Sequence, residues 1–298
     1  MSALTSPASG RVYGVQRVCA AWAFPRASYY ASDPAGLGAD TVGKRGPKTA
    51  LDDAQLLALI RTDLAQSPFR GEGHRKVFGR LRYVAGHRVG RNRILRLMRL
   101  HRLLSPHRGT PVPAKAHDGR IITAAPNLRW ATDGAKVWTT DDGWLWLFTT
   151  LEHWNAECLG HHVCKRGDRF AAYEPVAQAL TRVFGSTAPA VARGVELRHD
   201  HGSQYLTDYF QGQSRFHGFT PSFAFVGEPE TNGVVERFNR TIKEQIIHGR
   251  TYRNRAELAA AVATFVALYN REWRLEKLRY KSPLEARLAF NQSIPLAA

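Results

Sequence analysis

The sequence is poor in cysteine, in acidic residues and in long apolar runs. Its 298 residues include three cysteines, Cys19, Cys158 and Cys164, which is too few for the disulfide framework of a small secreted protein. No stretch approaches the roughly 20 apolar residues that a membrane-spanning helix needs, and the N-terminus has no apolar signal core. These absences predict a soluble, cytoplasmic protein that binds no membrane.

The shortage of acidic residues is concentrated in the first part of the chain. The 42 lysines and arginines outnumber the 25 acidic residues, for a formal charge of +17. Residues 1–125 hold 21 basic and 7 acidic residues, whereas residues 126–298 hold 21 and 18. Basic surfaces bind phosphate backbones by releasing counterions. A basic solubility surface or an anionic-membrane binder has the same net charge, but the uneven split favours nucleic acid, either DNA or RNA.

Glycine- and proline-rich stretches divide the chain into four predicted parts. Residues 1–45 are a short helical segment and linker, and residues 46–110 are a helical domain. Residues 111–125 are a second linker, and residues 126–298 have the pattern of an α/β domain. The sequence therefore predicts a small helical region in front of a larger core.

The helical region has the pattern of a helix-turn-helix module. Three short helices are predicted within residues 51–104, and the last of them is amphipathic and rich in arginine. Short helices joined by glycine-containing turns are typical of such DNA-binding modules. The predicted phosphate contacts are arginines of this last helix: Arg91, Arg93, Arg96 and Arg99. A solvated basic face is the alternative interpretation.

From residue 126 the pattern changes to strands that alternate with helices. A hairpin is predicted around the turn at Asp142-Gly143. Strands are predicted at 129–140, 144–154, 157–164, 195–202 and 220–225. Helices are predicted at 168–185, 207–219, 232–249, 255–273 and 283–290. The last helix has Ser282 as its cap and Glu285 to complete a capping box.

Three acidic residues stand within a strand, near a strand end and at a helix start. Asp133 lies in the first predicted strand, Asp200 near the end of the fourth, and Glu236 in the first turns of a helix. Carboxylates that converge at one end of a sheet can hold divalent cations through hard oxygen ligands. Two such ions about 4 Å apart can activate the attacking oxygen and stabilise the leaving oxygen at a phosphodiester.

The flanks of these acids resemble a known family. They read RWATDGAKVWTTDDGWLWLFTTLE, HDHGSQYLTDYF and ETNGVVERFNRTIKEQ, with 35 residues between Asp200 and Glu236. They are similar to the second-frame protein (OrfB) of insertion sequences of the IS-three type, whose core is RNase H-like, as in retroviral integrases. The segment RVGRNRILRLMRLHRLL also resembles the family's small helix-turn-helix domain. The likeness therefore extends over nearly the whole chain.

The resemblance implies a fold, a reaction and a site. The implied fold is an α/β, RNase H-like mixed-sheet core behind a small all-α helix-turn-helix region. The implied reaction is that of a DDE-type transposase: cleavage at insertion-sequence ends, then strand transfer. Asp133, Asp200 and Glu236 would be catalytic and would bind Mg²⁺ or Mn²⁺, as two ions.

The resemblance also implies partners. These are double-stranded DNA, as terminal inverted repeats and as target, further copies of the chain, and a first-frame (OrfA) protein or a frameshift fusion to it. Such a protein would act in the bacterial cytoplasm in association with the nucleoid. Two features depart from the family. His201 stands where many members have arginine, and the N-terminus lacks the first-frame leucine zipper and helix-turn-helix region.

The helix of Glu236 carries further predicted DNA contacts. At 3.6 residues per turn, Arg240 and Lys243 share the face of Glu236, away from the apolar stripe. We expect the scissile phosphate at the metals and the next phosphates against these two cations. The alternative is a surface pair between Glu236 and Arg240, with Lys243 in solvent.

Other residues offer competing interpretations of the site. Glu228, Glu230 and Glu244 are weaker candidates for the third acid. His199 and His201, which flank Asp200, are expected to be structural or solvated. The segment CLGHHVC contains four possible zinc ligands, Cys158, His161, His162 and Cys164. Their spacing does not match zinc-finger patterns, so ordinary strand packing is the better interpretation.

Two other functions compete with transposition. A non-catalytic DNA-binding regulator derived from a transposase is disfavoured by the complete set of three acids. A ribonuclease H-type hydrolase of RNA–DNA hybrids is disfavoured by the basic helical region.

Overall fold

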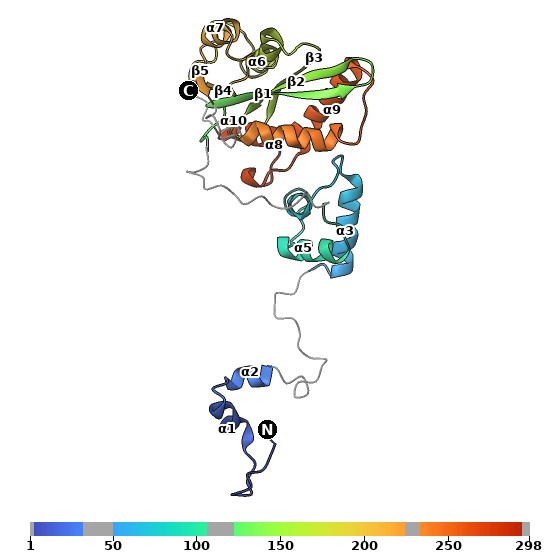
Figure 1. Cartoon of the computed structure of the whole chain (residues 1–298), viewed down its shortest axis with the longest axis vertical. Coiled ribbons are helices and arrows are strands. Elements are labelled where there is room, and N and C mark those ends of the chain that lie inside the picture. Colours follow the sequence, from blue (N-terminus) through green and yellow to red (C-terminus); the bar gives the residue numbers. More distant parts are fainter. Residues whose placement is uncertain (1–2, 32–49, 106–121, 224–232, 294–298) are drawn as a thin grey trace. The chain divides into compact units, whose positions relative to one another are not determined.

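The computed structural model describes residues 3–31, 50–105, 122–223 and 233–293. The chain divides into two compact units, residues 1–50 and residues 51–298. The first unit contains two short helices, α1 (Gly14–Ala21) and α2 (Arg26–Ala31), on either side of Pro25 (Figure 1). Among the described residues, no helix is both long and apolar enough to cross a lipid bilayer.

The second unit begins with the three predicted helices. Their bounds are α3 (Asp53–Gln66), α4 (His74–Gly79) with its π-helical continuation η1 (Arg80–Val84), and α5 (Arg91–Leu100). A capping box starts α3, because the backbone N–H of Gln55 donates to Asp52 and that of Asp52 donates to Gln55, at 2.7 and 3.0 Å. Such caps satisfy amides that have no partner within the helix. Buried apolar side chains hold the three helices together: Leu56, Ile60, Val77, Ile94, Leu97 and Met98.

Five strands form one mixed sheet in the order β3-β2-β1-β4-β5. The strands are β1 (Arg129–Thr139), β2 (Gly143–Glu152), β3 (Cys158–Cys164), β4 (Glu196–His199) and β5 (Thr220–Phe223). The first three are antiparallel neighbours, whereas β4 and β5 run parallel to β1. The predicted α/β, RNase H-like fold class is confirmed.

Helices cover both faces of the sheet (Figure 1). They are α6 (Arg169–Phe184) and α7 (Asp208–Phe216) on one face, and α8 (Gly233–Ile242), the π-helical η3 (Lys243–Ile247) and α9 (Arg255–Glu272) on the other. Successive side chains of β1 point to opposite faces of the sheet and so contribute to both cores. Trp130 is buried on the α6 side and Ala131 on the α8 side. A Cβ at Gly160 would lie 2.0 Å from the carbonyl oxygen of Pro175, so the close approach of α6 to β3 requires glycine.

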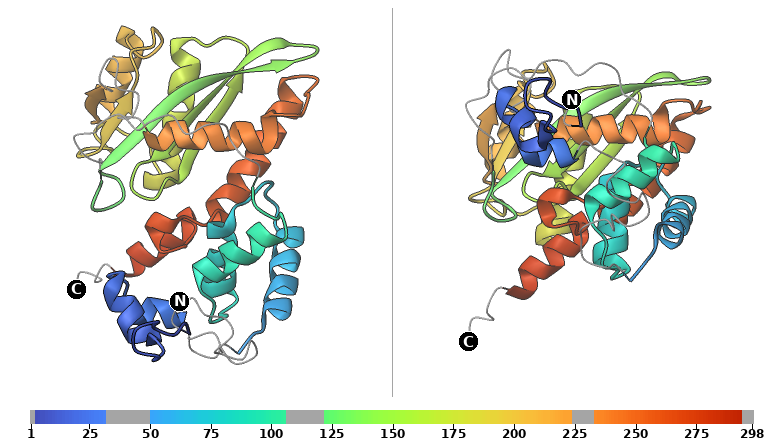
Figure 2. Two further views of the ribbon diagram at one scale, coloured as in Figure 1. Left: turned by 60° about the horizontal axis from the view of Figure 1, so that its bottom comes forward. Right: turned by 90° about the horizontal axis from the view of Figure 1, so that it is seen from below.

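The chain ends in a short 3₁₀ turn, η4 (Glu276–Leu278), and the helix α10 (Pro283–Ser293). The predicted capping box of α10 is confirmed: Glu285 N donates to Ser282 Oγ at 3.2 Å, and Ser282 N donates to Glu285 Oε2 at 2.9 Å. The helical region contacts this last part of the chain (Figure 2) through ion pairs and aromatic side chains described below.

Candidate active site

Asp133 lies in the middle of β1 with its carboxyl group half-buried. The backbone N–H of Gly134 donates to Oδ1 at 2.8 Å, and the side chain of Asn239 donates to Oδ2 at 2.8 Å. Burial, the largest cause, and repulsion from Asp200 together raise the pKa of Asp133 to about 6, although the hydrogen bonds from Gly134 and Asn239 lower it. Two carboxylates that repel each other at close range favour a proton or a cation between them.

Asp200 directly follows β4, the parallel neighbour of β1. Its exposed carboxylate accepts a hydrogen bond from Gly202 N at 2.9 Å, which forms a tight turn after the strand. The adjacent His199 is buried; its ring stacks on Tyr205 at 5.3 Å and lies 3.2 Å from the amide nitrogen of Gln211. The ring of His199 therefore packs inside the fold at the end of β4, whereas the next residue, Asp200, is exposed.

Glu236 is the fourth residue of α8 and is half-buried. One turn later, Asn239 contacts Asp133, and the charge of Lys243 lies close enough to lower the pKa of Asp133. Residues at these spacings share one side of a helix, so α8 presents the side of Glu236 towards β1. In the described parts of the chain, no three acidic, histidine or cysteine side chains are gathered closely enough to hold a metal ion. The structure thus pairs Asp133 with Asp200 and sets Glu236 on the adjoining helix.

Asn239 is the site residue that the sequence interpretation missed. It is buried, and its amide oxygen lies 3.4 Å from the hydroxyl of Thr149 on β2. This contact directs the amide NH₂ towards Asp133 and so fixes the carboxylate. The sequence signal that could have identified Asn239 is its position three residues after Glu236, which places both residues on one side of the helix. Of the alternative acids, Glu228 and Glu230 lie outside the described residues, and Glu244 is half-buried in η3.

The four predicted arginines of α5 differ in their surroundings. Arg93 and Arg96 both pair with Asp53, at 2.7 and 2.5 Å, and Arg93 also donates to the carbonyl of Leu51. Arg91 pairs with Glu276 at 2.9 Å. Arg99 is exposed on the surface. Most of this charge is therefore engaged by acids of the same chain.

The two predicted DNA contacts that follow Glu236 also differ from each other. Arg240 is exposed, whereas Lys243 is half-buried and lies near Asp133. The α-helical geometry ends at Ile242, and Lys243 begins the π-helical turn η3. Lys243 therefore influences Asp133 from the first residue of this π-helical turn.

The cysteines of β3 are enclosed by the fold. Cys158 is fully buried, and its backbone exchanges two hydrogen bonds with the side chain of Asn270, at 2.9 and 2.8 Å. The thiol of Cys164 donates to the carbonyl of Arg166 at 3.1 Å. Burial raises the pKa of both thiols, that of Cys164 to about 11. The strand-packing interpretation agrees with these contacts, and the expected absence of zinc stays a prediction.

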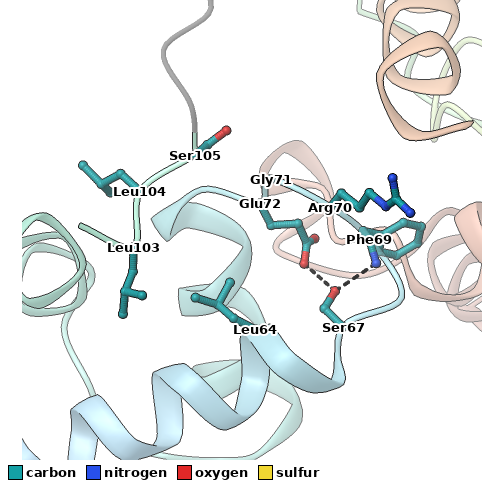
Figure 3. A pocket seen from close by; sticks show the side chains of 9 residues that line it. All are labelled: Leu64, Ser67, Phe69, Arg70, Gly71, Glu72, Leu103, Leu104 and Ser105. Atoms are coloured by element: carbon teal, nitrogen blue, oxygen red, sulfur yellow. Dashed lines mark hydrogen bonds between the residues drawn. The ribbon is translucent and has the colours of Figure 1, made fainter. Parts of the chain in front are cut away.

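A surface pocket of about 420 Å³ lies elsewhere, on the helical region (Figure 3). Its wall includes Leu64, Phe69, Glu72 and Leu103. None of the three candidate acids, Asp133, Asp200 and Glu236, lines this pocket.

Comparison with known proteins identifies the family. An integrase core domain model matches residues 217–283. "Transposase InsD for insertion element IS2A/D/F/H/I/K" of Escherichia coli is 30% identical over 250 residues, which cover 82% of this chain and 81% of that protein. The chain belongs to the insertion-element transposases. The InsD transposase of insertion element IS2-9 of E. coli K12 is equally similar, with 79% of its length covered. This transposase is of the DDE type, as the resemblance implied.

Retroviral integrases are among the solved structures that this transposase resembles. The magnesium complex of the HTLV-2 integrase catalytic core (trimeric form) aligns with 15% identity and a TM-score of 0.42, over 55% of this chain and 98% of that one. The integrase of a simian T-cell lymphotropic virus intasome in complex with the PP2A subunit B56 gamma aligns with 15% identity and a TM-score of 0.44, over 83% and 77%.

Proposed function

We propose that this transposase cuts DNA at the ends of an insertion element and joins the freed 3′ ends to target DNA, with Asp133, Asp200 and Glu236 as its catalytic residues. The observation that carries the proposal is the Asp133–Asp200 pair, with Asp133 on β1 and Asp200 directly after its parallel neighbour β4, next to the helix of Glu236. An electrostatically coupled pair of carboxylates, one of them shifted in pKa, is typical of a functional site.

The donor chemistry of this pair fits a hard divalent cation. Carboxylate oxygens are preferred ligands of magnesium, and a cation would relieve the repulsion between Asp133 and Asp200. Asp133, Asp200 and Glu236 would hold Mg²⁺ or Mn²⁺, in two ions. When bound, such ions activate the attacking oxygen and stabilise the leaving oxygen of a phosphodiester.

The protein's own groups would orient the carboxylates and the DNA. Asn239 and the backbone N–H of Gly134 hold the two oxygens of Asp133 in place. Lys243, beside Asp133, and the exposed Arg240 would neutralise phosphates next to the cut. In this arrangement the DNA end lies along α8 with its scissile phosphate at the acids.

The helical region would supply much of the remaining duplex affinity. We assign residues 46–110 as the helix-turn-helix-like DNA-binding domain, residues 1–45 and 111–125 as flanking segments, and residues 126–298 as the catalytic core. Of the arginines on α5, Arg99 is exposed on the surface and would contact phosphate directly, whereas Arg91, Arg93 and Arg96 would have to leave their acidic partners to bind DNA.

The proposed partners follow from this reaction. They are duplex DNA, as terminal inverted repeats and as target, together with further copies of this chain. A first-frame protein, separate or fused by frameshifting, would add end recognition. The site of action would be the bacterial nucleoid.

A metal-dependence assay tests the proposal. A labelled duplex carrying the inverted repeat that flanks the gene should be nicked and joined to plasmid in Mg²⁺, and EDTA should stop both steps. D133N should bind the duplex without nicking it. Cleavage restricted to an RNA–DNA hybrid would indicate a ribonuclease H-type hydrolase, and binding without any metal-dependent cleavage would indicate a non-catalytic regulator.

A further inference from the structure

Gln245 connects the catalytic helix to the helical region. It lies in η3, which continues α8 without a break, and it is buried. Its side-chain NH₂ donates to the carbonyl of Arg70 at 2.8 Å, and its side-chain oxygen accepts from the N–H of Arg70 at 2.8 Å. Both polar groups of the carboxamide are thus paired with the backbone of one residue. Arg70 belongs to the loop between α3 and α4.

That loop is seated firmly against the core. The ring of Phe69 packs edge-on against Trp273 at 4.8 Å and lies 6.4 Å from Phe265 of α9. The hydroxyl of Ser67 donates to Glu72 at 2.6 Å and accepts from Phe69 N at 3.3 Å (Figure 3). Hydrogen bonds within residues 67–72 therefore stabilise the loop, in addition to its contacts with Gln245.

A second contact fixes α4. The ammonium group of Lys76 lies 3.7 Å from the centre of the Trp273 ring and donates to the carbonyl of Arg274. At the start of α5, Arg91 pairs with Glu276, which also pairs with Arg75 at 3.0 Å. Both helices are thereby attached to the segment that follows α9.

Tyr280 completes this attachment. Its ring packs on Phe78 at 5.3 Å and stacks on Tyr83 at 5.2 Å. A Cβ at Gly79 would lie 2.6 Å from the Tyr280 ring, so the contact depends on the absence of a side chain there. The φ of Gly79 is −58°, an ordinary helical value, so glycine is needed for space and not for backbone conformation.

We propose that Gln245 and the Tyr280 contact determine which phosphate of the DNA held by the helical region lies at Asp133 and is cut. We call this alignment of the DNA with the site the register. The α8–η3 segment contacts Asp133 through Asn239 and the helical region through Gln245. The helical region is thus held in a fixed position relative to the helix of Glu236. Gln245 is therefore a positioning residue for the reaction. This inference rests on the proposed function, because it requires DNA to be bound by the helical region.

Two variants loosen the attachment by different means. Q245A removes both hydrogen bonds to Arg70. G79A places a methyl group against Tyr280, and it leaves α4 intact because alanine is a better helix former than glycine. The matched control is Q292A, since Gln292 is an exposed glutamine on α10. Hydrogen exchange of residues 67–72 measures the attachment without DNA, and we expect it to be faster in both variants.

The catalytic readout is the position and rate of nicking on a labelled duplex with the inverted repeat that flanks the gene. In the wild type and Q292A we expect one nick position. In Q245A and G79A we expect nicks at several neighbouring phosphates and a kcat lowered about 10- to 100-fold, the loss that an ångström-scale misplacement causes. KM and duplex affinity should stay unchanged, whereas a general loss of folding would lower affinity as well.

Several outcomes would overturn the inference. If hydrogen exchange at residues 67–72 is unchanged in both Q245A and G79A, these contacts do not attach the helical region to the core. If hydrogen exchange at residues 67–72 is faster in the variants but their nick position and kcat equal those of the wild type, the attachment does not determine which phosphate is cut. A wild-type protein that binds the duplex but nicks nothing in Mg²⁺ would instead contradict the proposed function, and the register inference with it.

Discussion

The two basic helices of this transposase, α5 and α8, use their charge differently. On α5, Arg93 forms an ion pair with Asp53 and is half-buried. On α8, Arg240 is exposed, and Lys243 in the following turn η3 lies near Asp133. In sequence the two segments look alike, because both alternate cations with apolar residues. The comparison teaches that a count of arginines predicts polyanion binding, whereas the acids that fold against them decide which cations are available.

The largest effects should come from the acids beside α8. D133N and D200N should each lower nicking and joining by about 10⁴-fold or more, as loss of a central catalytic group does. Duplex affinity should stay within the error of a gel-shift assay, because carboxylates do not contact phosphates favourably. Retained joining by either variant would remove that residue from the site.

Asn239 should come next. N239A removes the hydrogen bond to Asp133 Oδ2, and loss of a group that orients a metal ligand typically costs 10- to 100-fold in metal affinity or activity, so we expect about that loss. Raising the Mg²⁺ concentration should restore part of the rate. T241A, on the same helix, is the matched control. Equal rates for N239A and T241A would show that Asp133 needs no such support.

The raised pKa of Asp133 predicts a pH dependence. Metal and proton compete for an ionised carboxylate, so the rate at low Mg²⁺ should fall about tenfold per unit as the pH falls below about 6. Saturating Mg²⁺ should move this fall to lower pH. A rate that is flat from pH 7 to pH 5 at low Mg²⁺ would contradict the assignment of the pKa.

The same pKa predicts the stability of the metal-free protein. The folded pKa lies above the unfolded value, so the folded state binds the proton more tightly. The stability that this proton contributes is therefore lost as the pH rises from about 4 through about 6. D133N lacks this loss, so its Tm near neutral pH should exceed that of the wild type without metal. Thermal unfolding at several pH values measures both proteins.

The smallest effects should separate the two basic helices. R93A should lower stability by roughly 1 kcal/mol, as for a partly exposed ion pair, with little change in the salt dependence of DNA binding. K243A should leave the Tm unchanged and reduce the slope of log affinity against log salt by about 0.9, the value for one phosphate contact. Salt titrations and thermal unfolding of both variants test the contrast, and the reverse pattern would overturn it.

Patterns within one segment were predictable, and contacts between segments were not. Hydrophobic alternation predicted β1 and β2, and the capping box at Ser282 was predicted from two side chains three residues apart. The acids Asp133 and Asp200 were found because their flanks resemble a family. Their proximity depends on the parallel pairing of β1 with β4, which periodicity does not reveal.

The remaining features depend on tertiary partners. Asn239 and Gln245 are ordinary helical residues in sequence, and their roles arise from Asp133 and Arg70, 106 and 175 residues away. The π-helical turn at Lys243 also has no local signature, because the segment has the apolar spacing of an α-helix. This turn contains Gln245, which contacts Arg70 of the helical region.

Glu236 tests the central claim most directly, because the described structure pairs the two aspartates and leaves this acid on the adjoining helix. The measurement is joining of a 3′-hydroxyl duplex end to plasmid in Mg²⁺ by E236Q, with a gel shift of the same duplex. The account predicts no joined product and an unchanged shift, since all three carboxylates are needed to hold the ions. Joined product at the wild-type level would contradict the three-acid site.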